Sequence, residues 1–234
     1  MADKEPTSRI EEYLESIINL MAEGKPVVSA RLAERLTLTP ATVSVTLHRM
    51  VRDGLIVLNK DKEIELTDKG RKAALSVLRR HRLAEKLLSD VLGVDFHEVH
   101  DEACLLEHAI SSKVEERLKK LLNNPATCPH GNPIPNGDIL PQPKGVPLSS
   151  VGAGGTVVLE RITEEASRNA KLMEYFHKAG LMPGAVFSVH AVDPYAGTIT
   201  LSRDDKQVTL AINASEMVWV TPKAKSPKLK QRSA

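Results

Sequence analysis

The chain has 234 residues, of which 41% are hydrophobic and 26% are charged, a composition that is typical of globular domains and sufficient for a buried core. It contains no run of about 18 apolar residues that could span a bilayer, and its acidic N-terminal segment, MADKEPTSRIEEYLE, does not resemble a secretory signal. We therefore expect one or two domains of a cytoplasmic protein with no membrane partner.

Charge is distributed unevenly along the chain. The formal net charge is +2, but residues 223–234 carry five basic side chains and no acidic one, so the remaining residues have a net charge near −3. A uniformly basic nucleic-acid binder is therefore excluded. A local basic patch lies in residues 25–62, which hold seven Lys or Arg and three acidic residues. We interpret the basic tail, residues 223–234, as disordered.

The N-terminal quarter begins with two predicted helices. Apolar residues at helical spacing indicate an amphipathic helix over residues 9–22, with Gly24 just beyond it as a stop. Ser29 is predicted to cap a second, short helix that extends to Leu36.

A third helix and a hairpin complete this segment. Thr39 and Pro40 supply an N-cap and a first-turn proline for a helix that ends at Arg52. Residues 55–58 and 64–66 then form two predicted strands around a polar turn. A helix pair with a tight turn, followed by a hairpin, predicts a winged helix-turn-helix.

The rest of the chain changes from helical to β patterns. Three amphipathic helices are predicted, over residues 68–91, 96–111 and 112–122. Seven prolines within residues 124–150 prevent regular structure and mark a connection between domains. Beyond them one helix is predicted over residues 165–178, together with four strands over residues 156–161, 185–192, 198–202 and 207–212.

The segment HEVHDEACLLEH, residues 97–108, holds the densest group of ligand-type side chains. On a single helix, four of them share a face at i, i+4, i+7 and i+8: His100, Cys104, Glu107 and His108. Thiolate, carboxylate and imidazole together suit a divalent transition metal ion, since soft sulfur disfavours magnesium and calcium. The alternative is that Cys104 is an ordinary buried residue beside a solvated polar stripe.

Two other predicted helices carry weaker ligand pairs. His81 and Glu85 are four residues apart in RRHRLAEKLL and therefore share a face, and the first helix places Glu12 and Glu15 on one side. Taken alone, the His81 and Glu85 pair is a weak signal, because such pairs often only decorate a helix surface, and surface solvation is also the alternative for Glu12 and Glu15.

The order of these motifs resembles that of a known family. The winged helix-turn-helix, RRHRLAEKLL, EVHDEACLLEH and NNPATCPHGNPIP are together similar to the diphtheria toxin repressor family of metal-dependent transcriptional regulators, especially its iron-dependent branch. The segment AGLMPGAVFSV is similar to the SH3-like, FeoA-like domain of its longer members. The resemblance covers nearly the whole chain.

The resemblance implies a mainly α protein with a smaller β domain. The expected segments are a winged helix-turn-helix DNA-binding domain over 1–72, a helical dimerisation and metal-binding domain over 73–140, a proline-rich linker over 141–152, an SH3-like, FeoA-like β barrel over 153–222 and the tail over 223–234.

The family's primary metal site implies four ligands here: Glu12, Cys104, Glu107 and His108. Glu12 departs from the iron-sensing pattern, which typically has methionine at this position. Manganese-sensing relatives have an acid there and a second acid three residues later, matched here by Glu15, but usually replace the cysteine by glutamate. The sequence is a hybrid of the two branches.

The family's ancillary metal site implies His81, Glu85 and His100, joined by residues of the SH3-like domain. Glu164 matches the first of these, whereas Ser167 stands where glutamine is common. We expect Fe(II) as the effector and Mn(II) as the alternative, with Co(II), Ni(II) or Zn(II) also binding in vitro.

Members of the family contact the major groove of DNA with the start of the recognition helix, so the resemblance implies DNA contacts at the matching positions here. For bases these are Thr39, Ala41, Thr42, Ser44 and Val45, with Arg49 and Arg52 as phosphate partners and Lys60 and Lys62 in the wing. Family members often have glutamine in place of Val45. Because valine can contact only a thymine methyl group, we expect the operator to differ from the family's usual one.

The expected function is therefore that of a homodimeric repressor, whose DNA-competent form is favoured by metal binding, acting on a double-stranded operator in iron homeostasis. Two alternatives remain open. A metalloenzyme could use the same ligands to activate water, although the chain lacks the HExxH arrangement of zinc proteases and we expect no enzymatic activity. A metal-independent winged-helix protein would carry vestigial ligands.

Overall fold

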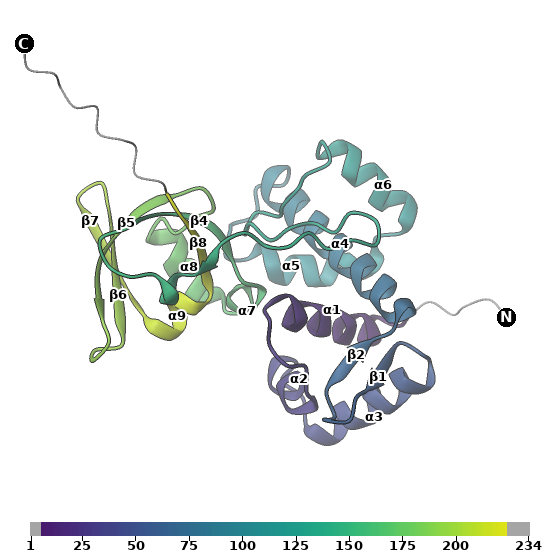
Figure 1. Ribbon diagram of the computed structural model, residues 1–234. Helices are drawn as coiled ribbons and strands as arrows, with labels where there is room; N and C mark the ends of the chain where they lie inside the picture. Colours follow the sequence, from purple (N-terminus) through teal and green to yellow (C-terminus); the bar gives the residue numbers. More distant parts are fainter. Residues whose placement is uncertain (1–5, 224–234) are drawn as a thin grey trace, which may run out of the picture. The chain divides into compact units, whose positions relative to one another are not determined.

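The computed structural model describes residues 6–223, whose helices and strands belong to two compact units (Figure 1). The first unit comprises residues 6–128 and 133–143, and the second comprises residues 129–132 and 144–223. The predicted disordered tail lies outside the described residues except for Lys223. Among the described residues, no helix is both long enough and apolar enough to cross a membrane. The predicted five-segment division remains a prediction, and its boundary at residue 72 falls inside a helix.

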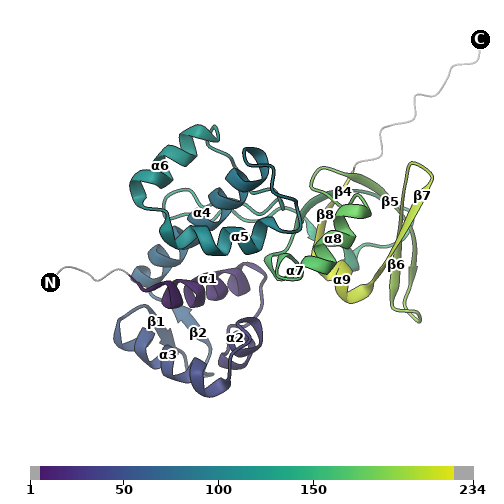
Figure 2. The same ribbon diagram turned by 180° about the vertical axis from the view of Figure 1, so that it is seen from behind.

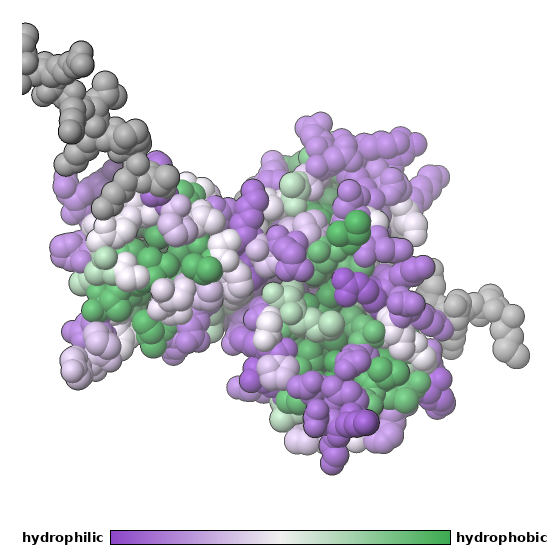
Figure 3. All heavy atoms as spheres, in the orientation of Figure 1, coloured by the Kyte–Doolittle hydropathy of each residue, from purple (hydrophilic) through white to green (hydrophobic). Residues whose placement is uncertain are grey.

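The winged helix-turn-helix is present as predicted. Its elements are α1 (Ser8–Ala22), α2 (Ser29–Arg35), α3 (Pro40–Arg52), β1 (Ile56–Leu58) and β2 (Ile64–Leu66). The two strands are antiparallel and pair Leu58 with Ile64 across the turn. Hydrophobic atoms reach the surface beside this hairpin, whereas hydrophilic atoms cover the region of α6 (Ser112–Leu121) (Figure 3).

The caps of α2 and α3, the two helices of the helix-turn-helix, differ from each other. Thr39 caps α3 as predicted, because its hydroxyl accepts a hydrogen bond of 3.2 Å from the backbone amide of Thr42. The predicted cap of α2 is wrong: Ser29 is already helical, and the N-cap is Val28, which makes no side-chain capping bond. Burial of Leu32 and Ala33 in the core supports this short helix instead.

Helix α4 (Asp68–Asp90) crosses the whole first unit and takes part in two hydrophobic cores. Its N-terminal half packs Leu75 and Leu78 into the core of the winged helix. Its C-terminal half packs Ala84 and Leu88 against α5 (Val99–Leu106) and α6. The polar stretch RRHR, residues 79–82, lies between the two cores. Helix α1 lies between α4 and the α2–α3 pair in both views (Figures 1 and 2).

The predicted helix over residues 96–111 is wrong at both ends. Helix α5 begins at Val99 and ends at Leu106, and the chain continues as a 3-10 helix, η1 (Glu107–Ala109). The helix has to end before Ile110, because Ile110 enters the second core with extended backbone angles and Ser111 is extended to cap α6. The predicted helices over 68–91 and 112–122 are confirmed within one residue.

The second unit is built on one antiparallel sheet with the strand order β3-β8-β4-β5-β6-β7. Its strands are β3 (Val146–Pro147), β4 (Thr156–Ile162), β5 (Val186–Asp193), β6 (Thr198–Arg203), β7 (Lys206–Ala211) and β8 (Val218–Pro222). Its helical segments are η2 (Leu148–Ser150), α7 (Glu164–Ser167), α8 (Ala170–Lys178) and α9 (Ile212–Glu216). The four predicted strands are confirmed, whereas β3, β8 and α9 were not predicted.

The helix predicted over residues 165–178 is two helices, and Asn169 is the reason. Its backbone is extended, with φ −116° and ψ 90°, and its side chain accepts a 3.1 Å hydrogen bond from the amide of Leu172. Asn169 therefore ends α7 and caps α8.

We expect a severe loss of stability from Gly70→Ala. An added Cβ at Gly70 would lie 1.8 Å from the backbone oxygen of Leu55, a buried residue of the winged-helix core. Relieving such an overlap costs about 1–3 kcal/mol or more. Urea unfolding followed by circular dichroism should show this loss, while the exposed neighbour variant Arg71→Ala should unfold like the parent. Equal midpoints for the two variants would contradict the close packing of α4 on Leu55.

Candidate metal centre and nucleic-acid interface

His81 occupies the centre of a buried polar cluster in the first unit. It lies in the polar stretch of α4, with a side chain that is 0% exposed. Its Nδ1 donates a 2.6 Å hydrogen bond to Oε2 of Glu107 in η1 and lies 3.7 Å from Oε1 of Glu15 in α1. Its Nε2 lies 3.3 Å from Oε1 of Glu85, one helical turn later. Three separate elements therefore converge on one imidazole.

Helix α5 extends this cluster with a second imidazole and a thiol. Nδ1 of His100 lies 3.2 Å from Nε2 of His81 and 3.7 Å from Oε1 of Glu85. The two rings meet edge to face, with centroids 4.9 Å apart. Sγ of Cys104, one turn further along α5, lies 3.7 Å from Nε2 of His100.

His108 is attached to the other end of the cluster. Its Nε2 lies 3.3 Å from Oε1 of Glu107, and its Nδ1 donates a 2.7 Å hydrogen bond to Oε2 of Glu11 in α1. The other oxygen of Glu11 accepts a hydrogen bond from the guanidinium of Arg80 in α4. The predicted ligands of the first unit, except Glu12, thus form one continuous series of contacts from His108 to Cys104.

This arrangement differs from the predicted one at the end of α5. The single helix face expected for the four ligands of residues 97–108 does not exist, because Glu107 and His108 belong to the 3-10 turn η1. One hydrogen bond, from His81 of the ancillary set to Glu107 of the primary set, joins the two predicted sets, and their division into two metal sites remains a prediction.

Helix α1 presents two acids to the cluster, Glu11 and Glu15, while the side chain of Glu12 is exposed. Sequence reasoning missed Glu11, although a signal was present: Glu11 and Glu15 are four residues apart and therefore share a helix face. The ligand role of Glu12 remains a prediction. So does that of Glu164, which is buried in α7 of the second unit, where Ser167 lies 3.4 Å from Nδ1 of His130.

The cluster holds ionised groups in a buried place. Burial lowers the pKa of His81, but the carboxylates of Glu15 and Glu85 outweigh it and leave that pKa well above its usual value. Burial also lowers the pKa of His100. The hydrogen bonds that His100 makes with Cys104 and Glu85 raise this pKa more strongly, so that it reaches about 10. For Cys104, hydrogen bonds from His100 and His81 lower the thiol pKa against the effect of burial.

The donor atoms suit a transition metal ion. The ligand atoms of His81, His100 and Cys104 lie within 4.8 Å of one another, and so do those of Glu15, His81 and Glu107. Imidazole nitrogen, thiolate sulfur and carboxylate oxygen in one place match Fe, Co, Ni or Zn better than calcium or magnesium. A cation here would also replace protons in balancing the buried carboxylates.

The exposed face of α3 carries the predicted base contacts. Val45 is 73% exposed, Ser44 is also exposed, and Thr42 is partly exposed. One further residue of this face, His48, was not among the predicted contacts. Its Nδ1 donates a 2.7 Å hydrogen bond to the backbone oxygen of Ser44, which fixes the direction of its ring.

The predicted phosphate partners share an acidic neighbour. Nε of Arg49 lies 3.6 Å from one oxygen of Asp53, and Nε of Arg52 lies 3.3 Å from the other. In the wing, Lys60 and Lys62 are exposed. Asn59 holds this turn, because its side-chain oxygen accepts hydrogen bonds from the amides of Asp61 and Glu63.

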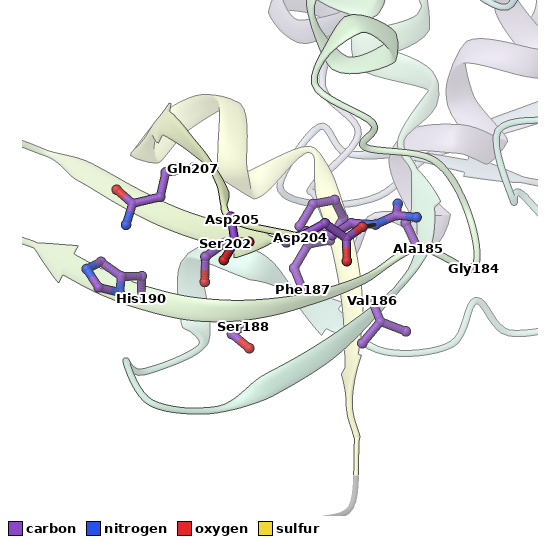
Figure 4. A pocket seen from close by; sticks show the side chains of 11 residues that line it. Gly184, Ala185, Val186, Phe187, Ser188, His190, Ser202, Asp204, Asp205 and Gln207 are labelled. Carbon is purple, nitrogen blue, oxygen red and sulfur yellow. Dashed lines mark hydrogen bonds and ion pairs between the residues drawn. The ribbon is translucent and has the colours of Figure 1, made fainter.

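The second unit contains a polar pocket on strands β5, β6 and β7 (Figure 4). His190, Ser188 and Gln207 line it, and the guanidinium of Arg203 lies 5.9 Å from the centre of the Phe187 ring. None of the predicted metal ligands is among its lining residues.

Known families match three consecutive parts of the chain. Residues 5–64 match the family described as iron dependent repressor, N-terminal DNA binding domain. Residues 67–136 match the one described as iron dependent repressor, metal binding and dimerisation domain. Residues 146–222 match the FeoA domain.

Curated relatives resemble the chain over most of its length. The iron-dependent repressor IdeR of Mycobacterium tuberculosis is 43% identical over 220 residues, which cover 90% of this chain and 95% of the relative. The diphtheria toxin repressor of Corynebacterium diphtheriae is 39% identical over 219 residues, covering 88% and 94%.

Solved structures agree in fold. A manganese-dependent transcriptional repressor in complex with manganese superposes with a TM-score of 0.82 at 33% identity, covering 92% of this chain and 100% of the other. The manganese regulator SloR gives a TM-score of 0.79 at 29% identity, covering 92% and 98%.

Metal-free protein should lose stability as pH rises. The unfolded chain binds these imidazole protons with a pKa near 6.5, whereas the folded pKa values of His81 and His100 are raised. Their contribution is therefore complete below about pH 6.5 and is lost as pH rises through the folded values, about 10 for His100. In chelator, the urea midpoint should fall between about pH 7 and 10.

The variant His100→Gln should show a smaller fall than the parent. The matched control is His190→Gln, at an exposed position in the second unit, and it should keep the parent's pH dependence. Identical slopes for all three proteins would contradict the coupled charges of the cluster.

Proposed function

The chain belongs to the family of the diphtheria toxin repressor and the iron-dependent repressors, and we propose that it is a homodimeric transcriptional repressor whose binding to operator DNA requires Fe(II). The observation that carries the proposal is the unbroken series of contacts that joins α1 of the winged helix to the thiol of α5 through His81. A ligand set shared between α1 and α5 can transmit metal occupancy to the DNA-binding segment. The proposal therefore assigns the cluster a regulatory role rather than a hydrolytic one.

The choice of Fe(II) rests on Cys104. A thiolate favours Fe(II), Co(II), Ni(II) and Zn(II) over Mn(II). Zinc and nickel bind such sites more tightly than iron, so cellular availability selects the physiological ion. Mn(II) is the second candidate, because Glu15 and Glu107 add hard oxygen donors beside His81 and relatives of known structure are named manganese-dependent.

Metal binding would act by shifting a population of conformations. The winged helix contacts the cluster through α1, so ligands that come from α1, α4 and η1 can be satisfied together only in one arrangement of these elements. When bound, the cation balances the negative charge of the converging carboxylates. A shift from 1% to 99% of the DNA-competent form needs roughly 5.5 kcal/mol of differential affinity.

DNA binding would use the exposed faces already described. We propose that Thr39, Ala41, Thr42, Ser44 and Val45 approach base edges in the major groove, that Arg49 and Arg52 contact phosphates, and that Lys60 and Lys62 of the wing do the same. Two recognition helices of a dimer would read half-sites about one turn, ~34 Å, apart.

The dimer surface is proposed from exposed apolar side chains on α5 and just after α4. Leu92, just after α4, is 63% exposed, and Leu105 of α5 is 75% exposed. Of the leucines near them in the sequence, Leu88 belongs to the second core and Leu106 packs against it. A second copy of the chain is the occupant that the match to a dimerisation domain supports.

Fluorescence anisotropy with a labelled duplex, selected by this protein from a random pool in the presence of Co(II), tests the metal requirement. Under anaerobic conditions, Fe(II) should tighten DNA binding at least tenfold relative to chelator. Cys104→Ala should remove most of this effect, while Glu102→Ala, an exposed position on the same helix, should retain it. Equal binding in chelator and in Fe(II) would show a metal-independent DNA binder.

Leu105→Glu should dissociate the dimer, because it places a charge in the proposed apolar contact. Analytical ultracentrifugation should show a smaller species for this variant. Tyr195→Glu, at a fully exposed position in the second unit, serves as the control and should sediment like the parent. A parent protein that is monomeric with metal bound would refute the proposed dimer.

A further inference from the structure

The side chain of Glu11 lies between two basic side chains of other elements, Arg80 and His108. It projects from α1 and is only 13% exposed. One of its carboxylate oxygens accepts a hydrogen bond from Arg80 of α4, and the other accepts a 2.7 Å bond from His108 of η1. Glu11 therefore joins α1 both to α4 and to the end of the ligand series.

The direction of the bond to Glu11 determines which nitrogen of His108 remains available. An ionised carboxylate can only accept hydrogen bonds, so Nδ1 of His108 carries the proton. In the neutral imidazole, Nε2 then keeps its lone pair. That nitrogen lies 3.3 Å from Oε1 of Glu107. In that neutral form, the lone pair of His108 and an oxygen of Glu107 lie side by side, as two ligands of one ion would.

We propose that Glu11 is the positioning residue of the metal centre: it fixes the tautomer and the ring orientation of His108, without itself binding the ion. Carboxylates that accept the second N–H of a metal-ligating histidine have this effect, because they orient the ring and increase its basicity. The inference deepens the proposed function and rests on it for the ligand role of His108.

Arg80 restrains the Glu11 carboxylate from the other side. Its guanidinium occupies the other oxygen of Glu11 and, with a side chain 15% exposed, is itself largely covered. The pair restrains the carboxylate, so Glu11 stays directed at His108 instead of turning into the ligand cluster. The side chain of the neighbouring Glu12, by contrast, is exposed.

The first arm of the test uses full-length, metal-free protein with ¹⁵N-labelled histidine. Long-range ¹H–¹⁵N correlation spectra report the tautomer of each ring, and His108→Gln identifies the signals of His108. The parent should show the Nδ1–H form of His108, and Glu11→Leu should lose this preference. An Nε2–H form in the parent would overturn the proposal even if the metal-dependent function holds.

The second arm measures Co(II) affinity by competition with a chelator, together with the visible spectrum of the Co(II) protein. Glu11→Leu should weaken Co(II) binding about 10–100-fold, and the saturated spectrum should match that of the parent because the ligands are unchanged. Glu102→Gln removes an exposed carboxylate of α5 and should leave the affinity within about twofold.

Arg80→Gln should weaken Co(II) binding less than Glu11→Leu, and the double variant should be no weaker than Glu11→Leu alone, since both act through one carboxylate. A changed Co(II) spectrum in Glu11→Leu would make Glu11 a ligand and overturn the positioning role. An unchanged affinity in a folded Glu11→Leu protein would do the same. If the parent binds no Co(II), the proposed function fails, whereas the tautomer measurement still decides the role of Glu11.

Discussion

The buried hydrogen bond between His81 and Glu107 is the interaction on which the rest of the first unit depends. Both side chains are almost completely inaccessible, and a buried charged group is tolerated only when it is paired and hydrogen-bonded. The buried pair therefore needs further polar partners close to His81, and these are Glu15 on α1, Glu85 on α4 and His100 on α5. A polar centre that needs groups from α1, α4, α5 and η1 fixes those four elements relative to one another.

The position of this centre follows from the composition of α4. The helix supplies leucines to one core before residue 79 and to another after residue 83, and the polar stretch between them cannot join either core. The polar stretch instead gathers carboxylates, and Arg79 and Arg80 take part through Glu115 and Glu11. Helix α4 thus connects the core of the winged helix to a second core through a charged segment.

Periodicity and capping residues predict most of this fold, because local signals decide where α1, α3 and α4 begin and end. These local signals fail where packing in the tertiary structure or a cap within a helical pattern decides the end of a helix. Ile110 is required in a core, so α5 ends early, and Asn169 interrupts a helical pattern with a cap. The same limit applies to the site: helical spacing placed Glu107 and His108 on the face of Cys104, whereas the turn η1 directs them to α4 and α1.

Hydrogen exchange of the full chain, with and without Co(II), tests the central claim that the cluster joins the DNA-binding segment to the ligand helix. The account predicts that the metal slows exchange in α1, residues 8–22, as well as in residues 99–109, because ligands from both segments close around one ion. Protection confined to residues 99–109, with α1 exchanging at its metal-free rate, would contradict it.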